Sequence, residues 1–258
     1  KERVFHNCKR LTSVTIPDTV TSIGEFGFAY CETLPNITLP KDLKTIEVSL
    51  FEGCLQLSSI EIPASVTSIG INAFYDCKSL TSIEIPANVT EYGEALFSGC
   101  DRLSSVILPE GITEIPAHLF EGCTGLREYT VPEGVVLIGE GAFKECSNLR
   151  SVTLPESVTY IGPYAFQRCE NLSSIRIPDN VTAIGYESFQ GAGLSSITLP
   201  SKLEIIKESA FADCHNLTSV KIPDTVTKIE YRAFSYCFNL RSVDMPDNVD
   251  MDPDSVFY

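Results

Sequence analysis

The chain has 258 residues, 43% of them apolar, and a formal net charge of −15 at pH 7. This acidity argues against nucleic acids and anionic membrane surfaces as main partners, because both require a basic footprint on the protein. No apolar run approaches the ~18 residues that indicate a membrane-spanning helix, so we expect no membrane insertion of this segment.

One sequence pattern recurs along the whole chain, and residues 146–166, CSNLRSVTLPESVTYIGPYAF, show it best. A strict period of this length is typical of solenoid proteins, in which each repeat packs on its neighbours. The proline of the pattern returns every 23 residues, except for the 22 residues from Pro178 to Pro200. The eleven prolines are Pro17, Pro40, Pro63, Pro86, Pro109, Pro132, Pro155, Pro178, Pro200, Pro223 and Pro246.

The first half of each repeat predicts a short strand. In residues 149–154, Val152 and Leu154 have the alternating spacing of a strand, with Thr153 between them. Pro155 cannot donate a hydrogen bond to a strand ladder, so the strand is expected to end there. Turn-forming residues follow the proline, as in Asp179-Asn180.

The second half of the repeat is expected to return to the core. Val158 and Ile161 point inward, and Phe166 and Cys169 are three residues apart, so one turn of helix would place both on one face. The glycine after the isoleucine suggests a left-handed residue. Pro116 occupies the same position in another repeat, and proline fixes φ at about −65°, so the position does not require that conformation.

The pattern C-x-x-L-x-S-V-x-L-P-x-x-V-T-x-I-G-x-x-A-F resembles the BspA-like (Treponema pallidum-type) leucine-rich repeats over nearly all 258 residues. The fold that we expect is an α/β repeat: a right-handed leucine-rich-repeat solenoid of eleven 23-residue coils, with a parallel sheet on the concave side and short helical turns opposite. The resemblance further implies a bacterial secreted or cell-surface protein that attaches to host proteins or other cells.

Residues 1–258 are expected to form one solenoid domain, because the repeats distribute the core along an axis. The sequence starts and stops inside a repeat. It therefore predicts a fragment of a longer surface protein, whose export and anchoring signals lie outside this segment.

Two repeats depart from the pattern. After Phe189, residues 190–194 are one residue short, and Ala192 stands where the cysteine belongs. We expect a tightened loop there with the strand register kept. In the last repeat Asp252-Pro253 replaces Ile-Gly, and a charge at this position is suited to the end of a solenoid.

The ten cysteines predict buried free thiols, because they occupy one repeated inward position and Ala192 replaces one as a small core residue would. Neighbouring cysteines would lie one strand spacing apart, ~4.8 Å, which leaves disulfides open. No C-x-x-C occurs and the chain has three histidines, so a metal site is not expected. Without a G-x-S-x-G motif or another catalytic pattern, we expect no enzyme and no cofactor.

Ligand binding is expected on the outward face of the sheet. One outward column is nearly all serine, and its hydroxyls favour a structural ladder. The neighbouring column does not repeat, and it changes from acidic residues such as Glu84 to basic ones late in the chain. The candidate ligand-binding residues are Ile107 and the cations Arg127, Arg150, Arg176 and Lys221.

These cations on an acidic chain predict a salt-sensitive contact with an acidic protein or glycan on a host or neighbouring cell. Several alternatives stay open. The face can be a mixed solvated surface, and a row of tyrosines that includes Tyr164 and Tyr186 is a second candidate surface. The whole chain can also be a passive spacer that presents another domain, or, more weakly supported, an enzyme with a site on the sheet.

Overall fold

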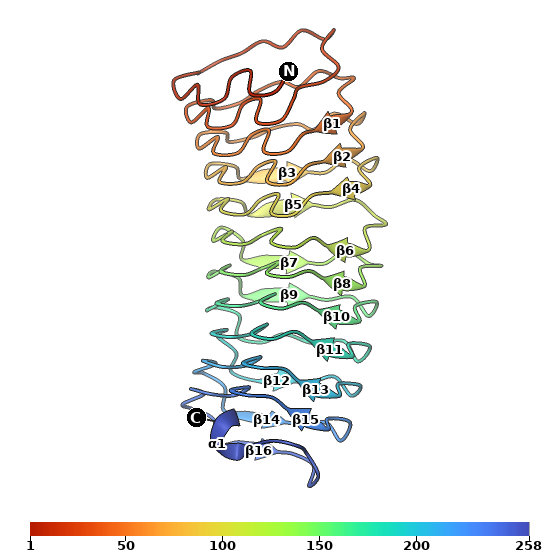
Figure 1. Ribbon diagram of the computed structural model, residues 1–258, viewed down its shortest axis with the longest axis vertical. Helices are drawn as coiled ribbons and strands as arrows, with labels where there is room; N and C mark the ends of the chain where they lie inside the picture. Colours follow the sequence, from red (N-terminus) through yellow and green to blue (C-terminus); the bar gives the residue numbers. More distant parts are fainter. Residues whose placement is uncertain (258) are drawn as a thin grey trace. The chain divides into compact units, whose positions relative to one another are not determined.

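The computed structural model describes residues 1–257, which group into two compact units. The first unit contains Lys1–Ile112 and His118–Leu126, and the second contains Thr113–Ala117 and the residues from Arg127 onward. Within each unit the chain runs in successive coils that follow the sequence repeat, so that each coil lies beside the next one (Figure 1).

The T-x-I segment of the repeat forms a row of short parallel strands. In the first unit the order is β1-β2-β4, and in the second it is β15-β13-β11-β10-β8-β6. The register is one repeat per step, as in Ile161↔Ile184, and the isoleucines point into the core. The strands are β1 Thr45–Ile46, β2 Ser68–Ile69, β4 Glu91–Tyr92, β6 Glu114–Ile115, β8 Leu137–Ile138, β10 Tyr160–Ile161, β11 Ala183–Ile184, β13 Ile205–Ile206 and β15 Lys228–Ile229.

The predicted strand before each proline forms a second parallel row. Its side chains alternate exposed, buried, exposed, as in Ser151, Val152 and Thr153. Pairs β3-β5 and β7-β9 and the triplet β12-β14-β16 carry the row. The strands are β3 Ser82–Glu84, β5 Ser105–Ile107, β7 Glu128–Thr130, β9 Ser151–Thr153, β12 Ile197–Thr198, β14 Ser219–Lys221 and β16 Ser242–Asp244.

The expectation of one sheet with eleven strands is therefore corrected. Within residues 1–257 seven strands precede a proline, and nine T-x-I strands mark the regular coils. The first repeat at Ile23 and the last at Asp252 have no T-x-I strand. The parallel-sheet solenoid with about 23 residues per coil is confirmed.

The expected helical turns are replaced by irregular turns, because each coil holds two left-handed residues four positions apart. Tyr164 has φ 56° and Arg168 has φ 57°, so an α-helix cannot continue through this segment. Alternate backbone N–H groups instead bond the next coil: the N–H of Phe166 donates to the carbonyl of Ser188 at 2.7 Å. A regular coil is thus hydrogen-bonded to its neighbours along three segments: the strand before the proline, the T-x-I strand and the irregular turn that follows it.

The glycine after the isoleucine is not left-handed, as the proline substitution predicted. Gly93, for example, does not have a positive φ. In the repeats that have this glycine it has a different role, because a Cβ on Gly93 would lie 2.2 Å from the backbone nitrogen of Ile71 in the preceding coil. The glycine therefore permits close approach of two coils.

Both departures from the pattern are visible in the second unit. Arg176 and Thr198 still pair across the short repeat, so the strand register is kept. In the last repeat α1, Pro253–Val256, forms, since Asp252 accepts a hydrogen bond from the N–H of Asp254 and Pro253 occupies the first turn. This helix is the only one in residues 1–257.

The core of both units is a column of stacked phenylalanines beside a column of thiols. The rings lie 5.1–6.2 Å apart from Phe5 to Phe120 and 5.2–5.9 Å apart from Phe143 to Phe257. All ten cysteines are free, and all except Cys8 are buried, which confirms the predicted thiol column. At least eight of the nine buried thiols donate to a phenylalanine carbonyl of the preceding coil, as Cys54 does to Phe28 at 3.2 Å.

None of the helices in residues 1–257 has the length and apolar character needed to cross a membrane.

Candidate functional site

The non-repeating outward column forms a continuous line over the strands before the prolines in the second unit. Arg176 pairs with Thr198, which lies in register with Lys221 of β14 and then with Asp244 of β16. The side chains of Arg176 and Lys221 are 68% and 80% exposed. The face therefore presents different chemistry on each coil, whereas the serine column beside it repeats.

The two cations of this column are not free. Arg176 forms an ion pair and hydrogen bond with Glu156, and the ammonium of Lys221 lies 3.9 Å from the carboxylate of Asp244. Exposed pairs of this kind contribute ~0–1 kcal/mol, and the side chains can exchange partners easily. The carboxylates of Glu156 and Asp244 nevertheless cancel most of the positive charge that Arg176 and Lys221 would otherwise present to a ligand.

Arg127 and Arg150 lie just before β7 and β9, where their coils meet. The N–H of Arg150 donates to the carbonyl of Arg127 at 2.7 Å, so the two backbones are adjacent. Both side chains are exposed, and neither has a carboxylate partner within residues 1–257. Two exposed arginine side chains thus lie on adjacent coils at this edge of the face, with no ion-pair partner among residues 1–257.

An acidic row borders the same face after the prolines. Glu133, Glu156 and Asp179 follow Pro132, Pro155 and Pro178 and are exposed. The N–H of Ser201 donates to the carboxylate of Asp179 at 3.1 Å, and this bond lowers the pKa of Asp179. The face thus has a basic edge before the strands and an acidic edge after them, which the sequence analysis did not identify.

Ile107 belongs to the first unit, where it ends β5 in register with Glu84 of β3. Its side chain is 55% exposed, as expected. Two hollows of about 440 and 370 Å³ lie along the same strand row, and Glu61 and Ala64 line both. Ala64 and Ala87 follow the prolines of two adjacent coils, where most other coils carry a longer charged residue.

Within the row of tyrosines predicted as a second surface, Tyr164 and Tyr186 form a close pair. Tyr164 and Tyr186 pack edge to face, with ring centroids 4.9 Å apart, in the turn segments that follow β10 and β11. Burial, a hydrogen bond with Tyr186 and nearby carboxylates raise the pKa of Tyr164 to about 12. Tyr186 is 42% exposed.

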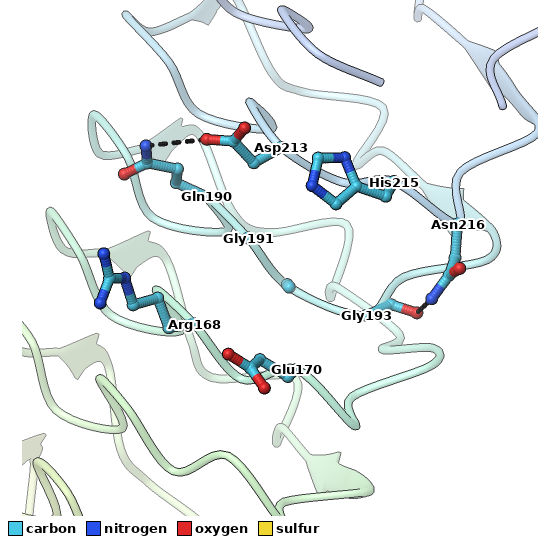
Figure 2. Close-up of a pocket in the computed structure, with 9 residues that line it drawn as sticks. Arg168, Glu170, Gln190, Gly191, Gly193, Asp213, His215 and Asn216 are labelled. Carbon is cyan, nitrogen blue, oxygen red and sulfur yellow. Dashed lines mark hydrogen bonds between the residues drawn. The ribbon is translucent and has the colours of Figure 1, made fainter. Parts of the chain in front are cut away.

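The short repeat carries a feature that sequence analysis missed, a polar pocket of about 460 Å³ (Figure 2). Its floor is Gly191-Ala192-Gly193, where one residue is missing. Arg168 and Glu170 stand on one side, and Asp213, His215 and Asn216 stand on the other (Figure 2). The deletion and the two glycines are the sequence signal that could have revealed it.

The His, Cys, Asp and Glu side chains of residues 1–257 form no group of three that could hold a metal ion. Burial raises the pKa of the buried thiols, which keeps them protonated at neutral pH. The surface chemistry of this chain is therefore that of ion pairs, amides, hydroxyls and aromatic rings.

Comparison with known proteins identifies the repeat. The family model described as the BspA type leucine rich repeat region matches in six copies over residues 1–127, 114–192 and 182–258. A search of the curated proteins finds no match.

Solved structures with the same fold include two leucine-rich proteins. A leucine-rich repeat protein from Bacteroides ovatus is 29% identical with a TM-score of 0.74, over 97% of this chain and 76% of that one. A leucine rich cell surface protein from Faecalibacterium prausnitzii is 30% identical with a TM-score of 0.65, over 95% and 82%. The pneumococcal vaccine antigen PcpA is 20% identical with a TM-score of 0.58, over 83% and 63%, and shows the fold alone.

Proposed function

The chain belongs to the BspA-type leucine-rich repeat family, and from this premise we propose that it is a non-catalytic module of a secreted or cell-surface protein that binds an acidic protein on a host or neighbouring cell. The family and the fold support a protein-interaction module. The extracellular location is proposed because the similar Faecalibacterium prausnitzii protein is described as a cell surface protein.

The adjacent pair Arg127 and Arg150 is the observation that carries the proposal. Both guanidinium groups are exposed, and within the described chain neither is neutralised by a carboxylate. A guanidinium presents a planar fork of donors that matches a carboxylate. The surrounding chain has a net charge of −15, so an acidic partner is guided to this edge and repelled elsewhere.

Arg176 and Lys221 extend the proposed contact along the face. Their present partners, Glu156 and Asp244, are exposed, so a ligand carboxylate can replace them at small cost. We therefore expect these two residues to contribute less than Arg127 and Arg150. Ile107 belongs to the first unit and is proposed as an apolar contact of its own strand row.

Charge reversal tests the assignment. The chain is passed over immobilised acidic matrix glycoproteins of a mammalian host, with poly-L-glutamate as the simplest acidic probe and heparin as an acidic glycan. We expect binding that weakens strongly between about 0.05 M and about 0.5 M salt. Arg127→Glu with Arg150→Glu should remove it, and Arg176→Glu with Lys221→Glu should weaken it.

The matched control is Arg232→Glu, an exposed arginine of the second unit whose guanidinium lies over the Tyr231 ring in a turn segment and not beside the strands before the prolines. This variant should bind like the unmodified protein. Binding that ignores all four cations and is lost on Tyr164→Ala with Tyr186→Ala would place the contact on the tyrosine pair. An absence of binding to every probe at low salt would favour the passive spacer, and binding to heparin alone would replace the protein ligand by a glycan.

A further inference from the structure

The pocket at the short repeat exists because two side chains are missing from rows that are filled in the neighbouring coils. Gly191 occupies the left-handed position that holds Arg168 in the preceding coil and Asp213 in the next. Gly193 packs so closely on the preceding coil that a Cβ would lie 2.0 Å from the carbonyl oxygen of Glu170. The floor of the pocket is thus backbone, and its two walls are polar side chains of the coil before and the coil after the short repeat (Figure 2).

The wall of the next coil is held in place. The amide of Gln190 donates to one carboxylate oxygen of Asp213 at 3.1 Å, and the amide of Asn216 donates to the carbonyl of Gly193 at 3.4 Å. The His215 ring stacks on Phe238 with ring centroids 5.2 Å apart. These contacts fix the directions in which the remaining polar atoms can bind a ligand.

Several polar atoms remain available in the pocket. His215 Nδ1 lies 2.9 Å from the carbonyl oxygen of Tyr236 and must donate to it, which leaves Nε2 as an acceptor. Within residues 1–257 the Glu170 carboxylate has no partner, and Asp213 keeps one oxygen free. Arg168 supplies hydrogen-bond donors from the side opposite Asp213 and His215 (Figure 2), because its ion pair with Glu145 is long, at 3.8 Å.

This set of atoms discriminates among ligand classes. A cation would satisfy the acceptors but would be repelled by Arg168, and an anion would be repelled by the two carboxylates. A hydroxyl group both donates and accepts, so neighbouring hydroxyls can bond the carboxylates, His215 Nε2 and Arg168 together. The net charge of the lining, one guanidinium against two carboxylates, further disfavours acidic sugars.

We propose that the pocket at Gly191-Ala192-Gly193 is a binding site for a neutral saccharide, separate from the basic edge of the sheet face. Its volume of about 460 Å³ falls in the range of small-ligand pockets, roughly 300–1,000 Å³. Phe238, which is 76% exposed beside His215, offers an apolar surface next to the polar walls. A neutral glycan of a cell wall or of a host surface has this chemistry.

Filling the pocket gives the sharpest test. In Gly191→Tyr the new side chain occupies a row in which Tyr236 has the same left-handed conformation, and a Cβ there meets only ordinary contacts from 3.6 Å. The fold should therefore tolerate it. Gly122→Tyr is the matched control, since Gly122 is the same row in a full-length coil of the first unit, with φ +71° and contacts from 3.6 Å.

The probes are mannose, galactose, glucose and N-acetylglucosamine with their β-linked disaccharides, titrated into isotope-labelled protein and followed by amide NMR shifts. We expect saturable shifts at the short repeat for at least one neutral sugar. Gly191→Tyr and Glu170→Gln should each weaken its binding about tenfold or more, whereas Gly122→Tyr should not change it. Circular dichroism verifies that each variant is folded.

Should Gly191→Tyr fail to fold, His215→Ala serves in its place, with the same expected loss. The proposal is overturned if no neutral sugar shifts these resonances, or if binding persists in both Glu170→Gln and the filled pocket. Binding of a lysine-rich peptide or of glucuronate at this pocket without any neutral sugar would overturn it as well. Because Arg127 and Arg150 do not line the pocket, charge reversal there should leave sugar binding intact, which separates this result from the proposed protein contact.

Discussion

The cysteine is the residue that most clearly connects sequence to packing in this chain. Its thiol fills one inward position per coil and donates to a phenylalanine carbonyl of the coil before it, as Cys100 does to Phe74 at 3.2 Å. Burial raises the pKa of these thiols, since the thiolate would lose its hydration. Ala192 takes the same position in the short repeat and is equally buried.

Thiol reactivity should follow this burial. In folded protein without reductant, Ellman's reagent should modify about one of the ten cysteines, Cys8, because the other nine are buried. In denaturant all ten should react. Few reactive thiols in denaturant without reductant would instead reveal disulfides and contradict the free-thiol column.

Alkaline pH should destabilise the fold through the same residues. Burial raises the pKa of Cys31 and Cys237 from 9.0 in the unfolded chain to about 11. Their contribution is therefore complete below pH 9 and is lost as the pH rises from about 9 to about 11, since only the unfolded chain releases the proton in this range. Thermal unfolding across this range should show a falling midpoint, and Cys237→Ala should reduce the slope; a flat profile would contradict the burial.

At the scale of the element, each coil is stabilised by the stacking of its phenylalanine ring on those of neighbouring coils, in addition to strand pairing. Phe166 stacks on Phe143 and on Phe189, each at 5.2 Å, whereas Phe5 has one stacked neighbour, Phe28 at 5.1 Å. Stacking adds to the large apolar area that each buried ring removes from water. A coil in the middle of a unit is thus supported from both sides.

Truncation of the rings should cost different amounts at the two places. Phe166→Ala should lower the free energy of unfolding by about 3–5 kcal/mol, because it leaves a cavity in a fully buried column. Phe5→Ala should cost much less, since Phe5 is half-buried at one end. Urea denaturation of both variants measures the difference, and equal losses would contradict stacking in which each coil depends on its neighbours.

The elements were predictable where the sequence has a period that a strand or a core requires. Val152 and Leu154 before Pro155 predicted their strand correctly, and the 23-residue period predicted the stacking. The T-x-I strands were missed because two residues are too short to show alternation. The segment from Tyr164 to Arg168 was wrongly predicted as helical, because left-handed conformations of ordinary side chains leave no trace in the sequence.

The candidate site was only partly predictable for a related reason. The outward position of Arg176 and Lys221 follows from strand alternation, and their exposure agrees with it. Their partners, Glu156 and Asp244, lie about one repeat away, so the ion pairs depend on side-chain reach across coils. The pocket at the short repeat depends on a deletion, whose consequence appears only when the neighbouring coils provide walls.

At the scale of the whole molecule, we propose that the regular coils provide a rigid scaffold and that the irregular coils carry the binding surfaces. Side chains that repeat, such as the buried phenylalanines and the thiols, bond coil to coil and leave little surface for a ligand. The non-repeating side chains gather at the basic edge of the sheet face and at the short repeat. The two proposed binding surfaces therefore lie outside the repeated side chains that form the core.

The central claim, that the basic edge is the contact for acidic ligands, is tested most directly by arginine modification. The chain is treated with phenylglyoxal with and without poly-L-glutamate at low salt, and modification is read by mass spectrometry. We predict protection of Arg127 and Arg150, with unchanged modification of the exposed references Arg168 and Arg232. Equal modification of all four arginines, or protection of Arg168 without Arg127 and Arg150, would contradict the account.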